Sequence, residues 1–175
     1  MKPPYLVFIL WTLAALLGIA VSLAHAAGWR INHTASLPPG LWRVRPVTGP
    51  ISAGQIVSFC PPDREPFRMA RQRGYLGTGA CPGGYEPLLK PVVAVTGDRI
   101  AITTGSIAVN GRPIANSATV FHDRQGREMP RLGPGTFTVG AGELWLISDY
   151  NAASFDSRYF GPVAFRQVLG IAFKF

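Results

Sequence analysis

The sequence predicts a mostly β protein, built from coiled antiparallel sheets and preceded by one N-terminal transmembrane helix. Short apolar or alternating segments recur at close spacing from residue 41 to the C-terminus, which is typical of strands. Most of the 20 Gly and 16 Pro lie among these segments, where they favour turns over long helices. A single uncharged apolar run precedes this region. At 175 residues, the chain has the length of one domain plus an appendage.

The apolar run covers residues 5–24 and predicts a helix that crosses a membrane. At about 1.5 Å per residue, its length matches a hydrocarbon core of about 30 Å. A cleaved signal peptide is the alternative, because Ala-His-Ala at residues 24–26 is an acceptable cleavage site. The run is longer than a usual signal-peptide core, so we expect residues 1–27 to be a retained anchor. Residues 28–175 would then form a domain outside the cytoplasm, with Lys2 on the inner side.

The body of the chain is expected to contain short strands and little helix. A short helix is predicted over residues 63–73, with Asp63 as its N-cap. The Gly-rich stretch 77–84 is expected to be an irregular loop, because no Gly-Lys-Ser/Thr closes it as a phosphate-binding loop. Asn110-Gly111 predicts a hairpin turn. The predicted strands cover residues 41–46, 54–59, 88–95, 99–103, 106–114, 136–139, 143–148 and 162–175.

Two cysteines, Cys60 and Cys81, lie within this body. They have no neighbouring histidine and are not spaced as Cys-x-x-Cys, so they make a poor metal site. Outside the cytoplasm, a disulfide between them is the expected state, and two buried free thiols are the alternative.

The chain carries a formal net charge of +8. Its arginines are scattered and no stripe of basic and aromatic residues accompanies them, which disfavours nucleic-acid binding and favours attraction to lipid headgroups. Lysine is scarce: apart from Lys2 and the penultimate Lys174, Lys90 is the only one.

Lys90 interrupts an apolar, valine-rich strand. Burial lowers the pKa of a lysine, and a neutral amine can accept a proton from a serine hydroxyl, whereas arginine stays charged. On this feature alone a snorkelling or edge-strand lysine is the favoured interpretation, and a general base is the hypothesis that the segments below support. The three histidines are His25, His33 and His122, and none has a context that favours a Ser-His-Asp triad or a zinc site.

Two further segments carry polar groups. Ser36 follows Asn-His-Thr-Ala and precedes Leu-Pro-Pro-Gly, which fixes an extended, kinked backbone close to the membrane segment. Residues 148–162 are rich in hydroxyl and charged side chains and follow an apolar strand. The alternative for this second segment is a solvated loop with a local Asp–Arg pair.

Together, the motifs resemble those of the type I signal peptidase superfamily. They are Ser36 with Leu-Pro-x-Gly, Lys90 ahead of Gly97-Asp98, Val-Asn-Gly at 109–111, and the run 154–161. The conjugative-transfer branch, the TraF peptidases that mature pilins, is most similar, because it shares Cys-Pro-Gly-Gly before Leu-Leu-Lys and a short chain with one apolar N-terminal segment. Pro91 and Ala94 depart from the pattern, where Arg and Gly are more usual.

The resemblance implies a role for each site residue. Ser36 is the nucleophile and Lys90 the base, while Thr34 helps to form the oxyanion hole beside the Ser36 N–H. Ser154 orients Lys90. Asp156 and Arg158 hold the loop that carries Ser154, and a direct part for Asp156 in catalysis is left open.

The expected function is a membrane-anchored serine endopeptidase that processes a pilin precursor for a conjugative transfer or type IV secretion apparatus. In this family an amine that resolves the acyl-enzyme would cyclise the pilin. A general signal peptidase acting on exported preproteins, and a non-catalytic membrane-tethered β module of a secretion assembly, are the alternatives. The expected place is the bacterial cytoplasmic membrane with the peptidase domain in the periplasm. The expected partners are a precursor protein and lipid, without a cofactor, a metal or nucleic acid.

Overall fold

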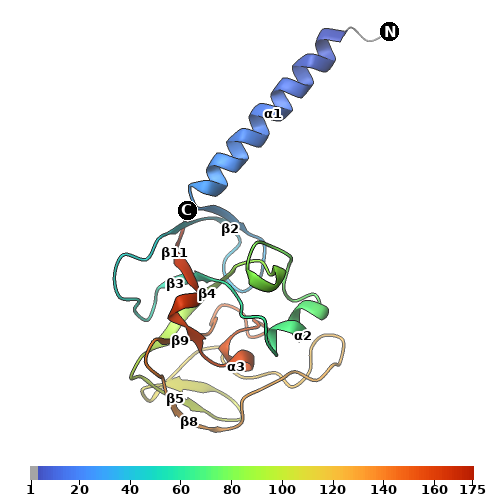
Figure 1. The fold of residues 1–175 in the computed structure, drawn as a ribbon. Helices are drawn as coiled ribbons and strands as arrows, with labels where there is room; N and C mark the ends of the chain where they lie inside the picture. The colour runs from blue at the N-terminus through green and yellow to red at the C-terminus, as the bar shows by residue number, and fades with distance from the viewer. Residues whose placement is uncertain (1–3) are drawn as a thin grey trace.

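The computed structural model describes residues 4–175, and its helix α1 (Pro4–Ala26) extends away from the rest of the molecule (Figure 1). Its segment Tyr5–Ala26 is long and apolar enough to cross a membrane, and no part of it is buried against the β body. A signal sequence near the N-terminus can pass the same test of length and composition, so cleavage is still the alternative. Gly28 turns the chain into the β body at φ 89°, where a side chain would collide with the Val44 carbonyl oxygen.

The strands of residues 4–175 form two antiparallel sheets, which confirms the predicted fold class. The larger sheet has the order β1-β2-β11-β3-β4-β9-β10 and the smaller one β7-β6-β5-β8. The strands of the larger sheet are β1 (Trp29–Asn32), β2 (Gly40–Arg45), β3 (Ile56–Phe59), β4 (Leu88–Val95), β9 (Glu143–Leu146), β10 (Val163–Ala164) and β11 (Val168–Lys174). Those of the smaller sheet are β5 (Arg99–Ile102), β6 (Ile107–Val109), β7 (Arg112–Pro113) and β8 (Gly135–Thr138).

Strands β4 and β9 contribute to two apolar clusters. In the first cluster, Val92 and Leu146 pack with Phe67 and Phe160 from two short helices, α2 (Phe67–Gln72) and α3 (Ser157–Phe160). In the second cluster, side chains of the same strands, such as Trp145, pack with residues of the smaller sheet. β4 is therefore held between neighbours on both edges and contributes to two cores.

The hairpin and most predicted strands are confirmed, with shifted ends. Asn110 and Gly111 both have positive φ, 49° and 79°, as a tight hairpin turn requires. The single strand expected over residues 162–175 is wrong, because a short 3-10 helix, η2 (Phe165–Gln167), separates β10 from β11. β1 was not expected at all, since its four residues directly follow the membrane segment and are stabilised by pairing with β2.

The helix predicted over residues 63–73 is shorter than expected, and Asp63 is not its N-cap. α2 begins at Phe67, after Pro66. The Asp63 carboxylate instead accepts hydrogen bonds from Arg68 and the Tyr85 hydroxyl, both at 2.9 Å. These contacts occupy the carboxylate that the local pattern predicted as the N-cap of the helix. In the Gly-rich stretch, Pro82–Gly84 makes a short irregular turn, η1, in which Gly83 has a positive φ of 77°.

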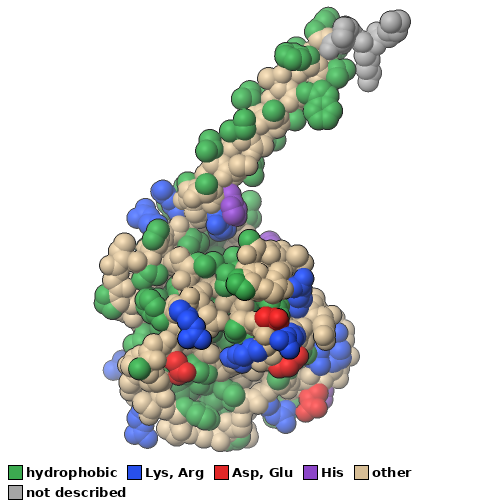
Figure 2. All heavy atoms as spheres, viewed as in Figure 1, with side chains coloured by type: hydrophobic (Ala, Val, Ile, Leu, Met, Phe, Trp, Pro, Cys, Tyr) green, Lys and Arg blue, Asp and Glu red, His purple; other side chains and the backbone are tan. Residues whose placement is uncertain are grey.

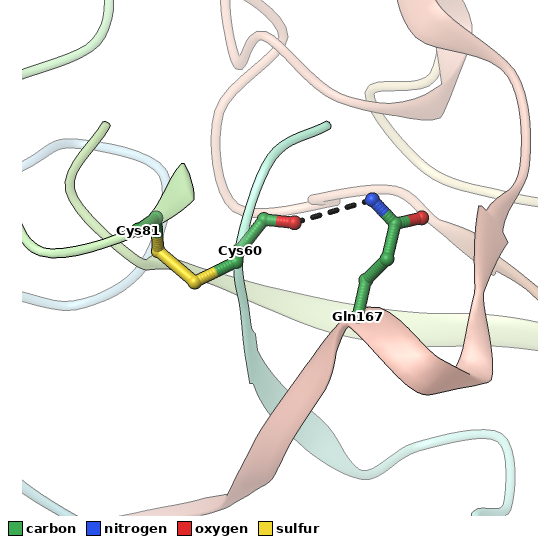
Figure 3. The surroundings of a disulfide bond; sticks show 3 residues. All are labelled: Cys60, Cys81 and Gln167. Atoms are coloured by element: carbon green, nitrogen blue, oxygen red, sulfur yellow. Dashed lines mark hydrogen bonds between the residues drawn. A yellow bond between two sulfur atoms is a disulfide. The ribbon is translucent and has the colours of Figure 1, made fainter. Parts of the chain in front are cut away.

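Cys60 and Cys81 form the predicted disulfide (Figure 3). It fastens the excursion between β3 and β4, which carries α2, to the end of β3. Cys60 is held on its other side as well, because its N–H donates to the Gln167 carbonyl at 2.9 Å and its carbonyl accepts from the Gln167 amide at 3.3 Å. The bond thus joins two regions that border the site described below.

Candidate active site

Ser36 lies at the middle of the loop that joins β1 to β2. The register pairs Asn32 with Gly40, which leaves residues 33–39 as the loop. Leu37 anchors it, because its side chain is buried in a small core with Trp42 and Ala172. The Trp42 indole N–H also donates to the Pro38 carbonyl at 3.2 Å. The loop is therefore tied to the sheet immediately after the serine.

Lys90 points from β4 into the main core. Burial alternates along this strand, and Lys90 shares its buried side with Leu88 and Val92, opposite Val57 of β3. Only 3% of the lysine is exposed. Since β3 and β9 flank β4, Lys90 is on a central strand, and the alternative of an edge-strand or snorkelling lysine does not describe it.

The structure brings Lys90, Ser36 and Ser154 together from three distant segments. The Lys90 amine lies 2.6 Å from Ser36 Oγ and 2.8 Å from Ser154 Oγ. The two serine oxygens are 3.3 Å apart. Ser36 and Lys90 thus have the contact that proton transfer requires, and Ser154 fixes the amine from a second direction.

Burial lowers the pKa of Lys90 from 10.5 to about 8. Desolvation is the main cause, because the charged amine has lost its water. The Asp156 carboxylate acts in the opposite sense, and the Arg158 guanidinium adds to the decrease. At neutral pH, a useful fraction of the amine is therefore in the neutral form that can accept a proton.

Asp156 and Arg158 form a buried ion pair beneath the Ser154 loop. Both side chains are fully buried, and two guanidinium nitrogens lie 2.7 Å from the two carboxylate oxygens. Asp156 also accepts from the Ser148 N–H at 3.0 Å and caps α3 through the Arg158 N–H. The remaining Arg158 donors reach backbone carbonyls of residues 116, 118, 148, 151, 152 and 154. Asp156 therefore contacts the loop and the guanidinium, and it influences Lys90 by its charge.

The structure adds two residues to which the sequence assigned no role. The Ser148 hydroxyl donates to the Ser36 carbonyl, so the end of β9 holds the backbone of the serine itself. The Asn32 side chain hydrogen-bonds the same loop, and its Oδ1 accepts a hydrogen bond from the Thr34 hydroxyl at 2.8 Å. The sequence signal for Ser148 was a polar residue at the end of the predicted apolar strand 143–148, whereas Asn32 had none, because β1 was not predicted.

Ser36 and Lys90 open into a cleft with a volume of about 1170 Å³. It extends from Ile31, near the base of α1, past the disulfide, to His122 in the loop after β7. The cleft is large enough for an extended peptide segment, and it begins close to the apolar helix seen projecting in Figure 2.

Comparison with known proteins gives one family across nearly the whole chain. A family model described as signal peptidase, peptidase S26, matches residues 4–175. The plasmid transfer protein TraF of Escherichia coli is 41% identical over 149 residues, which cover 85% of this chain and 82% of that protein. The probable conjugal transfer protein TraF of Sinorhizobium fredii is 43% identical over 152 residues, covering 87% and 79%. Among solved structures, a signal peptidase I from Enterococcus faecalis aligns with a TM-score of 0.41 at 16% identity, over 70% of this chain and 97% of that one.

Proposed function

Since the chain belongs to the signal peptidase S26 family, we propose that it is a membrane-anchored serine endopeptidase with Ser36 as nucleophile and Lys90 as general base. The observation that carries the proposal is the 2.6 Å contact between Ser36 Oγ and a lysine amine that is 3% exposed. A buried amine beside a hydroxyl is costly to maintain for structure alone, and it is the arrangement that activates a serine without a histidine.

In the proposed reaction, neutral Lys90 takes the Ser36 hydroxyl proton as Oγ attacks the scissile carbonyl carbon. The tetrahedral intermediate collapses when the protonated amine returns the proton to the leaving nitrogen, which breaks the peptide bond and leaves an ester on Ser36. A water molecule, or an amine, then attacks the ester with Lys90 again as base. Ser154 Oγ accepts a hydrogen bond from the Lys90 amine at 2.8 Å, which keeps the nitrogen lone pair directed at Ser36.

The negative charge of the intermediate needs hydrogen-bond donors. We assign them to the Ser36 backbone N–H and the Thr34 hydroxyl. In the structure the Thr34 hydroxyl donates to Asn32 Oδ1 at 2.8 Å, so it would have to exchange that acceptor for the oxyanion during the reaction.

The proposed substrate is a pilin precursor of a conjugative transfer apparatus. Support comes from relatives that are named as plasmid or conjugal transfer proteins and cover most of this chain. A signal peptidase I V of Bacillus subtilis matches more weakly, at 27% identity over half of the chain, which makes a general signal peptidase the second candidate. Attack of an amine on the acyl-enzyme, with pilin cyclisation, is part of the first candidate.

We place the active site at the outer surface of the cytoplasmic membrane. Exposed apolar side chains of β1, β2, β11 and the C-terminus support this location, since β2 and the C-terminus lie at the base of the helix that would cross the bilayer (Figure 1). They are Ile31, Leu41, Phe173 and Phe175, with exposures of 76%, 44%, 46% and 64%. Arg43 lies over the Trp29 ring and Arg45 over the Phe173 ring, a combination of aromatic and basic groups that suits a headgroup layer.

The test uses the full chain in detergent micelles with a pilin precursor and an exported preprotein as separate substrates. We expect cleavage of the pilin precursor and loss of that cleavage in Ser36→Ala. A cyclised product would be lighter than the linear product by one water. Cleavage by Ser36→Ala would contradict the peptidase mechanism, as expected for a non-catalytic β module. Preferential cleavage of the preprotein would favour the general signal peptidase.

A further inference from the structure

Asn32 occupies a special place in the hairpin that carries Ser36. It is the last residue of β1 and lies opposite Gly40, the first residue of β2, so the loop 33–39 begins and ends beside it. Only 7% of Asn32 is exposed. A buried amide at the neck of a loop needs partners for its polar atoms, and the backbone of the loop provides them.

The Asn32 side chain bonds the loop on both sides of the serine. Before Ser36, Oδ1 accepts from the Thr34 N–H at 3.2 Å and from the Thr34 hydroxyl at 2.8 Å, while Nδ2 lies 3.1 Å from the Thr34 carbonyl. After Ser36, Nδ2 donates to the carbonyls of Leu37 and Pro38, at 3.0 and 3.2 Å. One amide thus joins the two arms of the loop directly below its tip.

Building on the proposed role of Ser36, we propose that Asn32 is a positioning residue that holds Ser36 Oγ against the Lys90 amine. Lys90 is fixed by β4 and by Ser154, so the Ser36–Lys90 contact of 2.6 Å depends on the loop. Without the amide, Thr34 loses its hydrogen-bonded link to Leu37 and Pro38, and the arm before the serine is no longer tied to the arm that Trp42 anchors. A displacement of about 1 Å at a reacting atom can cost on the order of 100-fold in rate.

The chemistry of the site requires an amide. An aspartate at this position would keep the acceptor for the Thr34 N–H and hydroxyl. It would lose the donor that faces the Leu37 and Pro38 carbonyls and place negative charge beside these oxygens. Asn32→Asp therefore changes the connection across the loop at almost constant size.

The matched control is Asn110→Asp. Asn110 directly follows β6, in the hairpin turn, and also uses both amide atoms, accepting from the Arg99 N–H at 2.9 Å and donating to Asp98 at 2.8 Å. It belongs to the smaller sheet, away from Ser36 and Lys90. This variant makes the same chemical change in a hairpin that holds no reacting group.

The experiment measures kcat and KM of the full chain in micelles with a peptide that carries Ala-x-Ala before the scissile bond. We expect Asn32→Asp to lower kcat about 10- to 100-fold with KM changed by less than about twofold, while Asn110→Asp keeps kcat. The midpoint of the pH profile should stay in place, because the pKa of Lys90 is set by burial and by the charges of Asp156 and Arg158, which lie outside this loop. Wild-type kcat in Asn32→Asp, or an equal decrease in Asn110→Asp, would overturn the inference.

Asn32→Ser removes the amide without adding charge and serves if the buried carboxylate prevents folding. We expect the same decrease in kcat per folded molecule, with folding followed by the melting temperature. Ser36→Ala is measured in parallel. If Ser36→Ala is inactive while Asn32→Ser and Asn32→Asp keep wild-type kcat, only the positioning role fails. Activity in Ser36→Ala would overturn both proposals.

Discussion

At the scale of single residues, the site depends on the Lys90 amine, which is buried away from water. Lys90 lies on the buried side of a central strand, and the desolvation that lowers its pKa to about 8 comes from the apolar core around β4. The same strand also fixes the position of the amine. It places the amine between Ser36 and Ser154, which are its hydrogen-bond partners among the described residues. Charge state and position thus have one structural cause.

Replacing Lys90 by arginine tests whether the amine acts by titration or by charge. We expect Lys90→Arg to lose activity about as severely as Lys90→Ala, on the order of 10²- to 10⁴-fold, because a guanidinium cannot accept the serine proton. The measurement is precursor cleavage by variants whose melting temperatures show that they are folded. An active Lys90→Arg protein would end the Ser/Lys mechanism.

The pH dependence of cleavage follows from the lowered pKa of Lys90. The neutral amine is the active form, so kcat/KM should fall about tenfold per pH unit well below pH 8 and level off above it. An initial-rate series from pH 6 to pH 10, at subsaturating substrate, should place the midpoint near 8. A midpoint near 10.5, the value of an exposed lysine, would contradict the buried-base assignment.

At the scale of elements, three loops border the site, and the structure holds two of them by buried polar contacts and the third by a disulfide. The β1–β2 loop is joined by Asn32 and by the hydroxyl of Ser148. The segment after β9 is organised around Arg158, which bonds Asp156 and six backbone carbonyls. The excursion after β3 is closed by the disulfide.

Removing the Arg158 side chain should destabilise the fold strongly. Arg158→Met leaves the fully buried Asp156 carboxylate without its cationic partner, a change that typically costs about 3–5 kcal/mol. Chemical denaturation measures the free energy of unfolding. Arg68→Met is the control, because its pair with Asp63 is about half exposed and should contribute little. Equal effects of the two variants would argue against a buried clamp.

Opening the disulfide should lower the free energy of unfolding by roughly 3 kcal/mol, through the entropy of the chain between Cys60 and Cys81. The double variant Cys60→Ser, Cys81→Ser is compared with wild type in urea, before and after reduction. Reduction should bring wild type to the stability of the variant. If reduction and alkylation leave the wild-type stability unchanged, the bond is absent from the isolated protein.

At the scale of the whole molecule, an apolar helix and a β domain meet at an aromatic and basic surface. The C-terminus returns to the base of α1, where Phe175 packs against Trp29 (Figure 1). The cleft begins on the same side, at Ile31. A precursor held by its own membrane segment would therefore reach Ser36 along the bilayer surface.

The orientation of the chain is tested by a fusion. Alkaline phosphatase attached after Phe175 should be active, because the enzyme folds only outside the cytoplasm and Lys2 is expected to stay inside. An inactive fusion would contradict the predicted orientation of the chain in the membrane. Sequencing the N-terminus of the purified protein tests separately whether the anchor is retained. A start at Ala27 would show that α1 is removed as a signal peptide.

The sequence by itself determined the class of fold, the apolar helix, the hairpin at Asn110-Gly111 and the pairing of the cysteines. Each depends on a local signal: a period of apolar residues, a turn dipeptide or a count of thiols. It also singled out Ser36 and Lys90, because a lone lysine in an apolar strand and a serine before Leu-Pro-Pro-Gly are visible without a structure.

Only the tertiary structure decided how these residues meet. Strand β1 forms because it pairs with β2. The C-terminal segment is interrupted by η2, whose Gln167 side chain hydrogen-bonds the Cys60 carbonyl. The Asp63 carboxylate accepts hydrogen bonds from Arg68 and Tyr85 instead of capping the helix. The roles of Asn32 and Ser148 were likewise hidden. The sequence gives the type of a polar side chain, but its partner is set by contacts between segments up to 118 residues apart, which no local pattern records.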